Sequence, residues 1–271
     1  MCRPMTGGEI SQRQEALTRS IARCGSLLIA FSGGVDSALL AAISQEILGG
    51  RVHCVFVDSP LVPRSAVSSA ERIARDLGLS FEIISHPSLD ETVRKNPPDR
   101  CYHCKKTDSR ILKRRAEDLG LAAVADGVNL SDHAEHRPGL RASTEEGIIH
   151  PYIEAGITKA DIRAIARDRG LAFWDKPSAA CLASRIPYGE EITDEKLRMI
   201  EAAEAVLHQA GFVQARVRCH NGIARIEVIP EELDRLFAMR DVIVPALKKA
   251  GFSYIALDLE GYRAGSMDEV L

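Results

Sequence analysis

The sequence predicts an α/β protein with a doubly wound parallel sheet, followed by a small α+β domain. Two observations support this prediction: strand-like apolar runs alternate with segments of helical period, and most of these helical segments end at a glycine. Prolines interrupt the segment 173–187, where the alternation ends. We therefore expect the larger domain to cover residues 1–187 and the smaller one residues 188–271.

Short apolar runs and periodic segments alternate through the larger domain. The expected strands are at residues 27–31, 52–57, 81–84 and 122–125. Apolar residues recur at helical spacing between and after these runs, which predicts helices at 37–48, 65–77, 106–119 and 161–169. This order is the one in which crossover helices connect parallel strands.

The smaller domain begins with an amphipathic helix and continues as strands. Residues 193–209 form the expected helix, and its Thr-Asp-Glu start is typical of an N-cap. Residues 213–219 and 224–229 alternate like a hairpin around Asn221-Gly222. A helix over residues 231–250 and a final strand near residues 254–259 complete the domain.

Composition and charge limit the function classes. The chain has 45% hydrophobic and 27% charged residues and a net charge of −3, which disfavours a broad basic surface for nucleic acid. Residues 1–15 lack an apolar core, and no run approaches the roughly 18 apolar residues that a membrane span needs. We expect a cytoplasmic protein. Its seven cysteines point to free thiols, metal ligation or catalysis more than to disulfides.

The first expected strand runs directly into the motif S-G-G-V-D-S at residues 32–37, which opens a helix. The two glycines let the backbone approach an anion, and exposed N–H groups at the helix N-terminus supply positive potential. The motif lacks the lysine of a Walker loop. We expect it to hold the phosphates of ATP, with Asp36 helping to bind magnesium. The binding candidates in this loop are Ser32, Gly33, Gly34, Asp36 and Ser37.

A second polar loop follows the fourth expected strand. The carboxyl ends of parallel strands share one edge of a sheet, so both loops can face the same nucleotide. We expect Asp132 to assist the metal and Arg137 to contact phosphates or an acyl-adenylate, although such a loop on its own is more often a plain turn. The further candidates for nucleotide contacts are Asp126, Gly127 and Asn129 in this loop, and Asp58 at the end of the second strand.

Two cysteine-containing segments carry further chemistry. Cys101 and Cys104 form a C-x-x-C at an expected loop-to-helix junction, where Lys106 and the helix N-terminus would lower thiol pKa values. The pair is only half of a zinc site, and a redox pair is the other possibility. Cys181 lies among small residues in the proline-bounded segment. Taken alone, Cys181 could equally well be a reactive or metal-ligating thiol or a small buried side chain.

The motif at residues 32–37, the C-x-x-C segment and the run C-L-A-S-R-I-P-Y-G at residues 181–189 together resemble the LarE family of ATP pyrophosphatases. The resemblance covers nearly the whole chain and implies a PP-loop (adenine nucleotide alpha hydrolase-like) domain. It implies that a carboxylate of pyridinium-3,5-biscarboxylic acid mononucleotide is adenylated and becomes a thiocarboxylate, with AMP and pyrophosphate formed, in nickel-pincer nucleotide biosynthesis. It also implies a homo-oligomer with the small domain near the subunit contacts.

The resemblance assigns the sulfur chemistry to cysteines. Cys181 matches the sulfur-handling cysteine of the family, and Cys101, Cys104 and Cys181 match its members that bind a [4Fe-4S] cluster with an open fourth iron. Sacrifice of Cys181, a persulfide relay and cluster-bound sulfide all fit these residues. Asp36 and Lys106 are the further catalytic candidates.

The smaller domain supplies the expected site for the substrate phosphate. Arg216 and Arg218 resemble the family's phosphate-site arginines, and residues two apart on a strand point to the same face. Without the resemblance, a solvated strand face would be the better account of them. The other candidates are Ser184 and Arg185 for the phosphate, and Glu204 and Glu227 as metal ligands, although acidic residues on amphipathic elements usually face solvent.

Three other functions share some of these features. A tRNA thiolase also combines a PP-loop, a C-x-x-C and a third cysteine, but the acidic balance and the absence of a basic, aromatic-rich module disfavour RNA binding. Amidotransferases related to GMP or NAD synthetases share the loop but need no cysteine trio. The third alternative is a non-catalytic protein that binds ATP or an iron-sulfur cluster. Such a protein would not hydrolyse ATP to AMP, whereas each of the enzymes would.

Overall fold

The computed structural model describes residues 7–133, 138–177, 180–263, 265–267 and 269, and the chain divides into two compact units. The larger unit comprises Met1–Ser59, Arg64–Pro87 and Cys101–Ala179. The smaller unit comprises Pro60–Pro63, Ser88–Arg100 and Ala180–Leu271, so the chain enters it three times.

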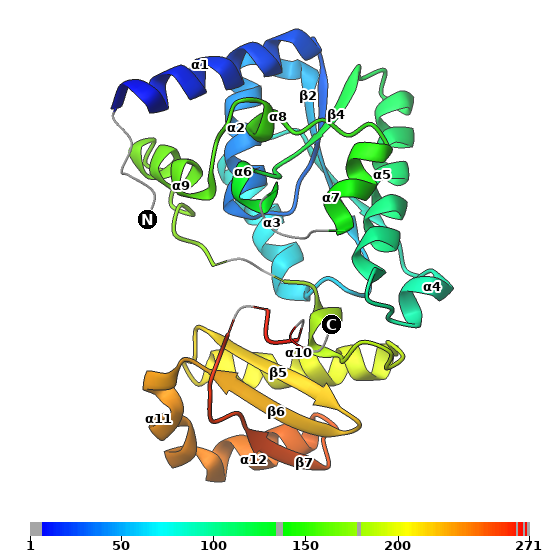
Figure 1. Cartoon of the computed structure of the whole chain (residues 1–271), viewed down its shortest axis with the longest axis vertical. Helices are drawn as coiled ribbons and strands as arrows, with labels where there is room; N and C mark the ends of the chain where they lie inside the picture. Colours follow the sequence, from blue (N-terminus) through cyan, green and yellow to red (C-terminus); the bar gives the residue numbers. More distant parts are fainter. Residues whose placement is uncertain (1–6, 134–137, 178–179, 264, 268, 270–271) are drawn as a thin grey trace. The chain divides into compact units, whose positions relative to one another are not determined.

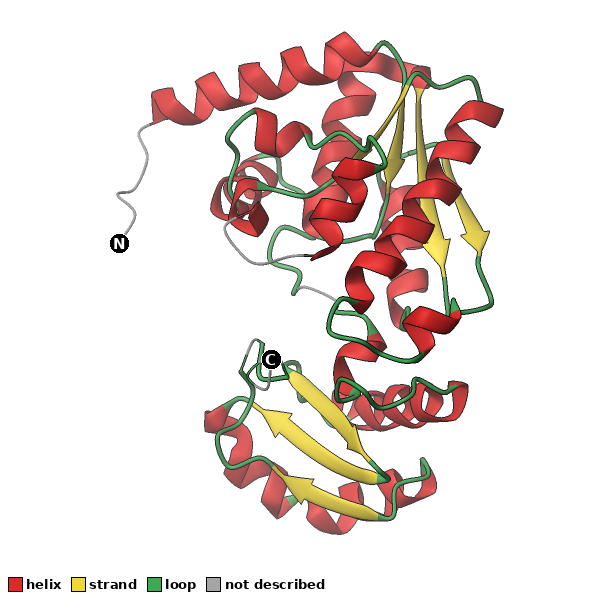
Figure 2. Ribbon diagram, turned by 45° about the vertical axis from the view of Figure 1, so that its right-hand side comes forward, coloured by secondary structure: helices red, strands yellow, loops and turns green. Residues whose placement is uncertain are grey.

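The larger unit contains a parallel sheet of four strands in the order β3-β2-β1-β4 (Figure 2). The strands are β1 (Leu27–Ala30), β2 (Val52–Asp58), β3 (Phe81–Ser85) and β4 (Ala123–Asp126). They confirm the predicted strands and the doubly wound class. The chain order reverses direction between β1 and β4, and ligands of such sheets bind outside the carboxyl ends of the strands at this point.

Helices cover both faces of this sheet (Figure 1). α2 (Val35–Leu48) contacts β1 and β2, and α3 (Arg64–Asp76) contacts β2. α5 (Arg100–Asp118) packs Leu112 and Ala116 into a buried cluster with residues of β1, β2 and β4. Within this cluster every member is at most 5% exposed, so α5 is fixed to the sheet through its C-terminal half.

The remaining helices of the larger unit are α1 (Gly7–Cys24), α6 (Leu130–His133), α7 (Pro138–Glu145), α8 (Pro151–Glu154) and α9 (Lys159–Asp168). The sequence did not predict α1, because few apolar residues mark its buried side; Leu17 and Ile21 are at most 1% exposed. α9 begins with a capping box in which Thr158 and Asp161 bond each other's backbone N–H groups.

The smaller unit contains α4 (Glu91–Arg94), α10 (Asp194–Gln209) and a three-stranded sheet in the order β5-β6-β7. β5 (Ala215–His220) and β6 (Ile223–Val228) form the predicted antiparallel hairpin, and β7 (Tyr254–Leu257) runs parallel to β6. The expected helix over residues 231–250 is two helices, α11 (Leu233–Ala238) and α12 (Arg240–Lys249). α11 ends in a tightened turn, because the Met239 N–H bonds to the carbonyls of both Arg235 and Leu236.

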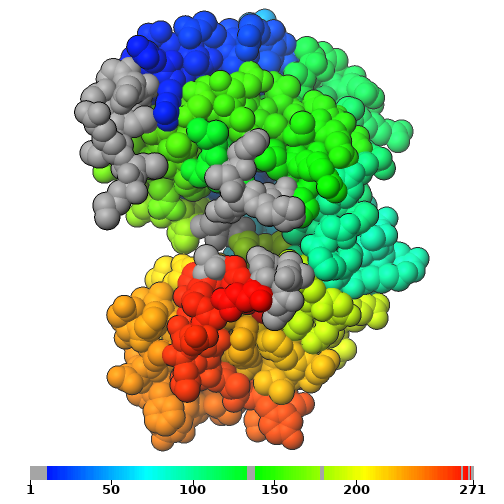
Figure 3. Space-filling model, viewed as in Figure 1, coloured from blue at the N-terminus to red at the C-terminus, as the bar shows by residue number. Residues whose placement is uncertain are grey.

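Segments that are distant in sequence are joined inside the smaller unit. Asn96 is fully buried and donates from Nδ2 to the carbonyls of Ile186 (3.3 Å) and Pro187 (2.7 Å). The Leu182 N–H donates to the Leu61 carbonyl at 2.8 Å. The segment that follows β7 lies on the surface of this unit (Figure 3, red). In the part of the chain that the structure describes, no helix has the length and apolar character that a membrane crossing requires.

Candidate functional site

The loop after β1 is folded around the hydroxyl group of Ser37. Ser37 Oγ accepts a hydrogen bond from the Ser32 N–H at 3.1 Å and lies 3.0 Å from Ser32 Oγ. The Gly34 N–H donates to Ser32 Oγ at 3.3 Å, and Gly33 has a φ of 66°, a conformation that favours glycine. These contacts shape the backbone at the start of α2 into a compact turn that can receive a phosphate anion.

Two glycines allow close approaches around this loop. A Cβ atom on Gly33 would lie 2.7 Å from Ala70 Cα, and one on Gly127 would lie 2.8 Å from the Ser37 nitrogen. Both distances are shorter than a van der Waals contact, so neither position accepts a side chain without movement. The loop after β4 therefore lies directly against the N-terminus of α2, and the structure brings the two predicted nucleotide loops together.

Asp36 has one paired and one unpaired carboxylate oxygen. Lys159 Nζ, at the start of α9, donates to Asp36 Oδ2 at 2.5 Å, while the buried Oδ1 has no hydrogen-bond partner among the described residues. Burial raises the pKa of Asp36 above its ordinary value, and the Lys159 hydrogen bond opposes this effect. A buried, unpaired carboxylate oxygen next to an anion loop suits a hard divalent cation such as Mg²⁺.

Asp126 occupies the end of β4 in a cationic environment. Its Oδ1 lies 2.7 Å from His150 Nδ1, and Lys105 Nζ lies 3.4 Å from Oδ2, which has no hydrogen-bond partner in the described structure. Burial alone would raise the pKa of Asp126, but Lys105 and His150 hold it below its ordinary value. Asp126 therefore remains a carboxylate that a cation bound to ATP can approach.

The other predicted nucleotide contacts already have protein partners. Asp132 Oδ2 accepts from both the N–H and the Nδ2 of the buried Asn129, at 3.1 and 2.7 Å, so these residues close the turn. Arg64 donates to both carboxylate oxygens of Asp58, at 2.8 and 2.5 Å. Arg137 lies outside the described residues.

Lys176 contacts the loop after β1, a role that the sequence pattern did not predict. Its ammonium group donates to the Gly33 carbonyl and to Ser69 Oγ, both at 2.6 Å. Burial, with a smaller contribution from Arg72, lowers the pKa of Lys176. Lys159 and His150 were missed as well. All three reach the site through the fold, and the only sequence signal for any of them was the position of Lys176 before a proline in the cysteine-bearing segment.

The C-x-x-C lies in the first turn of α5, because this helix begins at Arg100 rather than at residue 106 as predicted. Cys101 is exposed and Cys104 is half-buried, and their spacing places both on one helix face. Lys106 is directed elsewhere: it donates to the Tyr102 hydroxyl at 3.0 Å, and this bond raises its pKa. Within the described residues of either unit, no three His, Cys, Asp or Glu side chains gather in a way that would hold a metal ion.

A cavity of about 220 Å³ in the smaller unit is lined by four arginines. Guanidinium groups bind phosphate and carboxylate through paired N–H donors, so this cavity, hereafter the arginine pocket, suits an anionic ligand. Its polar and aromatic lining consists of Arg100, Ser184, Tyr188, Arg216, Arg218, Tyr262, Arg263 and Ser266.

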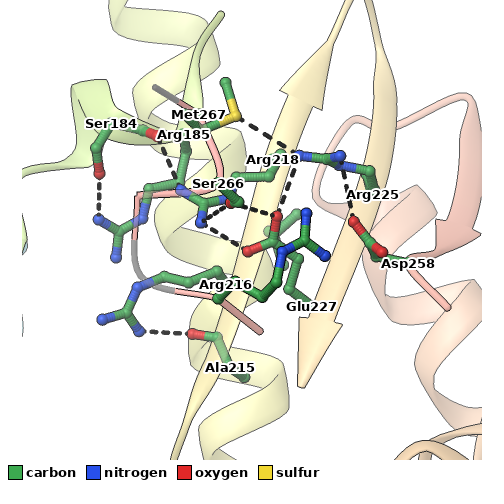
Figure 4. Close-up of polar contacts among 12 residues, drawn as sticks. Ser184, Arg185, Ala215, Arg216, Arg218, Arg225, Glu227, Asp258, Ser266 and Met267 are labelled. Carbon is green, nitrogen blue, oxygen red and sulfur yellow. Dashed lines mark hydrogen bonds and ion pairs between the residues drawn. The ribbon is translucent and has the colours of Figure 1, made fainter. Parts of the chain in front are cut away.

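The two arginines of β5 in this pocket differ in their partners (Figure 4). Arg218 donates to Glu227 at 2.6 Å and to the Ser184 carbonyl at 2.9 Å. Arg216 donates to the Ala215 carbonyl at 2.7 Å and lies over the Tyr262 ring, and it pairs with no carboxylate in the described structure. Burial lowers the pKa of Arg216, and the nearby charge of Arg185 adds to the effect. Arg216 is therefore a partly buried cation ready for an anion.

Three predicted contributors to the phosphate or metal site are engaged in ion pairs. Arg185 is buried and donates to Glu204 from Nε and Nη2 at 2.9 and 3.0 Å. Glu227, fully buried, accepts from Arg218 and from Arg225. In this structure Arg185 is therefore directed to Glu204, and both Glu204 and Glu227 have arginine partners. The phosphate role of Arg185 and the metal roles of Glu204 and Glu227 stay predictions.

Comparisons with known proteins agree with this architecture. A family model described as NAD synthase matches residues 9–117. An uncharacterised protein of Synechocystis sp. is 37% identical over 97% of this chain and 99% of its own length. The pyridinium-3,5-bisthiocarboxylic acid mononucleotide synthase of Lactiplantibacillus plantarum is 34% identical over 97% and 96%. A tRNA-specific 2-thiouridylase of Mycolicibacterium smegmatis is 29% identical over 73% and 64%.

The identity to the Lactiplantibacillus protein extends over both units, so the smaller unit with its arginine pocket is included in the likeness. The loop around Ser37 is the part that wider groups of PP-loop proteins share, and the family-model match ends at residue 117. The chain belongs to the LarE family, a branch of the PP-loop enzymes, and is an ATP-dependent sulfur-transferring enzyme.

Proposed function

We propose that this enzyme activates a carboxylate of pyridinium-3,5-biscarboxylic acid mononucleotide with ATP and converts it to a thiocarboxylate, a step in nickel-pincer nucleotide synthesis. The observation that carries the proposal is that the chain has an anion loop for ATP and also an arginine pocket in which Arg216 has no carboxylate partner among the described residues. The name of the Lactiplantibacillus relative, a bisthiocarboxylic acid mononucleotide synthase, supports this substrate.

The loop around Ser37 binds the phosphates of ATP. Backbone N–H groups at the start of α2 and the hydroxyl of Ser32 face the phosphate oxygens. The unpaired Asp36 Oδ1 would hold Mg²⁺, with Asp126 Oδ2 as a further oxygen. When bound, Mg²⁺ neutralises charge on the phosphates. Lys176 keeps the Gly33 carbonyl turned away from the anion by donating to it.

The arginine pocket binds the phosphate of the mononucleotide. Arg216 supplies the uncompensated charge, and Arg218 and Ser184 complete the lining. Glu227 accepts a hydrogen bond from Nη2 of Arg218, and this ion pair fixes the orientation of the guanidinium group. A pyridinium mononucleotide carries the dianionic phosphate that such a pocket prefers.

Sulfur transfer follows activation, because a carboxylate is a poor electrophile until AMP becomes the leaving group. A thiolate or hydrosulfide then attacks the acyl carbon, the C–S bond forms and AMP departs. Hydrosulfide gives the thiocarboxylate directly. The Cys181 thiolate gives a thioester, and removal of the Cys181 Cα proton with cleavage of its Cβ–Sγ bond then releases the thiocarboxylate and leaves dehydroalanine. Cys181 is the candidate sulfur carrier, since the pocket-lining residues Ala180 and Ser184 flank it. Sacrifice of its sulfur, a persulfide relay and cluster-bound sulfide are the three routes.

The donor set suits an iron-sulfur cluster. Cys101 and Cys104 present two thiols on one turn of α5, and Cys181 adds a third. Three thiolates and one open iron are the arrangement in which a [4Fe-4S] cluster could carry an added sulfide. We propose that these cysteines hold such a cluster, and the cysteine variants described in the Discussion test this assignment.

The activation step is tested with radiolabelled ATP, Mg²⁺ and the biscarboxylic mononucleotide under anaerobic conditions. We expect AMP and pyrophosphate, formed only when the mononucleotide is present. Formation of ADP alone would refute adenylation, and absence of any ATP turnover would favour a non-catalytic scaffold. Because of the likeness to a tRNA thiouridylase, the same assay with unmodified tRNA in place of the mononucleotide tests the alternative substrate.

A further inference from the structure

Arg185 lies in the interior of the smaller unit, where the residue is only 2% exposed. Arg185 is the last residue of the short helical turn η2 (Leu182–Arg185), which begins directly after Cys181. Its Nη1 donates to the carbonyls of Ala180 and Cys181, at 3.0 and 2.9 Å, and contacts Ser184 Oγ at 2.9 Å. One side chain thus binds the carbonyl groups on both sides of the Cys181 Cα, which carries the thiol.

The opposite edge of the same guanidinium is held by Glu204 of α10. The two groups form a bidentate ion pair of 2.9 and 3.0 Å. Glu204 Oε1 also accepts the Val217 N–H of β5 at 3.1 Å. Val217 lies between Arg216 and Arg218, so this carboxylate connects the cysteine segment to the strand that lines the arginine pocket.

Such a pair is a weak source of stability, because removing two charges from water offsets most of their attraction. Its contribution is geometric: the planar guanidinium and the carboxylate meet in one orientation, and each N–H has a fixed direction. Nearly every donor of Arg185 is used inside the protein, which leaves little capacity for a substrate phosphate.

We propose that Arg185 and Glu204 are positioning residues that hold the Cys181 thiol beside the arginine pocket. They act on the sulfur through the Ala180 and Cys181 carbonyls and touch no substrate. The inference rests on the proposed function only in giving Cys181 the sulfur-handling role. The positioning itself can be measured as the alkylation rate of the Cys181 thiol, which does not require sulfur transfer.

The test is Arg185→Lys, which keeps the charge but cannot span the carboxylate and both carbonyls. Iodoacetamide labelling of the iron-free protein, resolved by peptide mass spectrometry, gives the alkylation rate of each cysteine, because a thiolate bound to iron would be protected from the reagent. We expect the Cys181 rate to rise at least fivefold, with unchanged rates at the buried Cys54 and Cys219. The affinity for nicotinate mononucleotide, a pyridinium mononucleotide probe, should change less than twofold. In the sulfur-transfer assay kcat should fall at least tenfold while KM for the mononucleotide stays within twofold.

Arg240→Lys is the matched control, since Arg240 is an exposed arginine of the same unit whose contacts, to Asp241 at 3.8 Å and to the exposed Phe237, are all local. It should leave all of these values unchanged. If Arg185→Lys does not fold, Glu204→Asp, which keeps the charge and withdraws the carboxylate by one methylene, should give the same rise at Cys181.

An unchanged Cys181 rate in a folded variant would overturn the proposal, and a tenfold loss of probe affinity would assign Arg185 to the phosphate instead. A rise at Cys54 and Cys219 equal to that at Cys181 would also overturn it, because general loosening would then be the cause. These rates do not depend on ATP. A wild-type protein that forms no AMP therefore refutes the proposed function and leaves the alkylation result to decide the positioning.

Discussion

Gly127 lies so close to Ser37 that a Cβ atom there would stand 2.8 Å from the Ser37 nitrogen and 3.1 Å from Asp36 Cβ. The loop that follows β4 is thereby seated on the first turn of α2. An anion bound by the Ser37 loop and a cation held by Asp126 would then belong to one site, and each of the residues that shape this site can be tested separately.

Gly127→Ala should damage nucleotide binding more than folding. The added methyl group must push the β4 loop away from α2, and overpacking of this kind costs about 1–3 kcal/mol. We expect the affinity for ATP, measured by calorimetry, to fall at least tenfold. Gly50→Ala is the control, because a Cβ at Gly50 would meet no atom within 4 Å. Equal ATP affinities for the two variants would show that the close approach is irrelevant to binding.

Asp36→Asn should abolish Mg²⁺-dependent adenylation and leave the fold at least as stable. The pKa of Asp36 is raised by burial, so its ionised form disfavours the fold above its unfolded pKa of about 3.9, and the amide removes this penalty at neutral pH. Thermal unfolding at pH 7 without Mg²⁺ should give a Tm equal to or above that of the wild type. A large drop in Tm would make Asp36 a structural residue and contradict the proposed cation role.

Cys101→Ala, Cys104→Ala and Cys181→Ala should behave alike if the three thiols hold one cluster. Each should remove the brown chromophore and sulfur transfer together, because three thiolates are the ligands that leave one iron open, while AMP formation should survive. Anaerobic purification with iron and sulfide assays provides the measurement.

The sacrificial route makes a different forecast for the same variants. Only Cys181→Ala would then be inactive, and the wild-type protein would turn over once and lose about one H₂S from that residue by mass spectrometry. Multiple turnovers with intact Cys181 and supplied sulfide would exclude sacrifice. Active protein without iron would exclude the cluster.

Arg216→Met and Arg218→Met should separate binding from stability in the arginine pocket. Arg216 has no carboxylate partner in the described structure, so its loss should weaken binding of the mononucleotide by about 1.5–3 kcal/mol, roughly tenfold or more, with little change in unfolding free energy. Arg218→Met leaves the fully buried Glu227 with less positive charge and should cost about 3–5 kcal/mol of stability. Chemical denaturation and calorimetry measure the two effects, and the reverse pattern would contradict the assignment.

Local pattern was sufficient to predict the parallel strands and the hairpin, because strand length, alternation and turn residues are local properties. The start of α5 was missed, since the apolar spacing that predicted this helix covered residues 106–119, whereas the helix begins at Arg100. Lys159 and Lys176 reach the nucleotide loop through tertiary contacts that no spacing encodes.

The direction of the Arg185 side chain could not be predicted from the local sequence either. An arginine next to a pocket-lining serine indicates a phosphate ligand, and only the position of Glu204 on another helix turns it inward. The homo-oligomer and the cytoplasmic location remain predictions, and light scattering and cell fractionation would test them.

The smaller unit is built from three separate segments of the chain, and this limits how the two-unit architecture could have evolved. A single gene fusion at one end of a nucleotide-binding protein adds one contiguous stretch, but here the added part also needs the inserts around Leu61 and Asn96, whose backbone and side chain bond to residues 182–187. Loss of the C-terminal stretch would leave the buried Asn96 amide without its two carbonyl acceptors. The two units of this enzyme are therefore expected to be inherited together, and a swap of C-terminal parts between relatives should succeed only when both inserts travel with them.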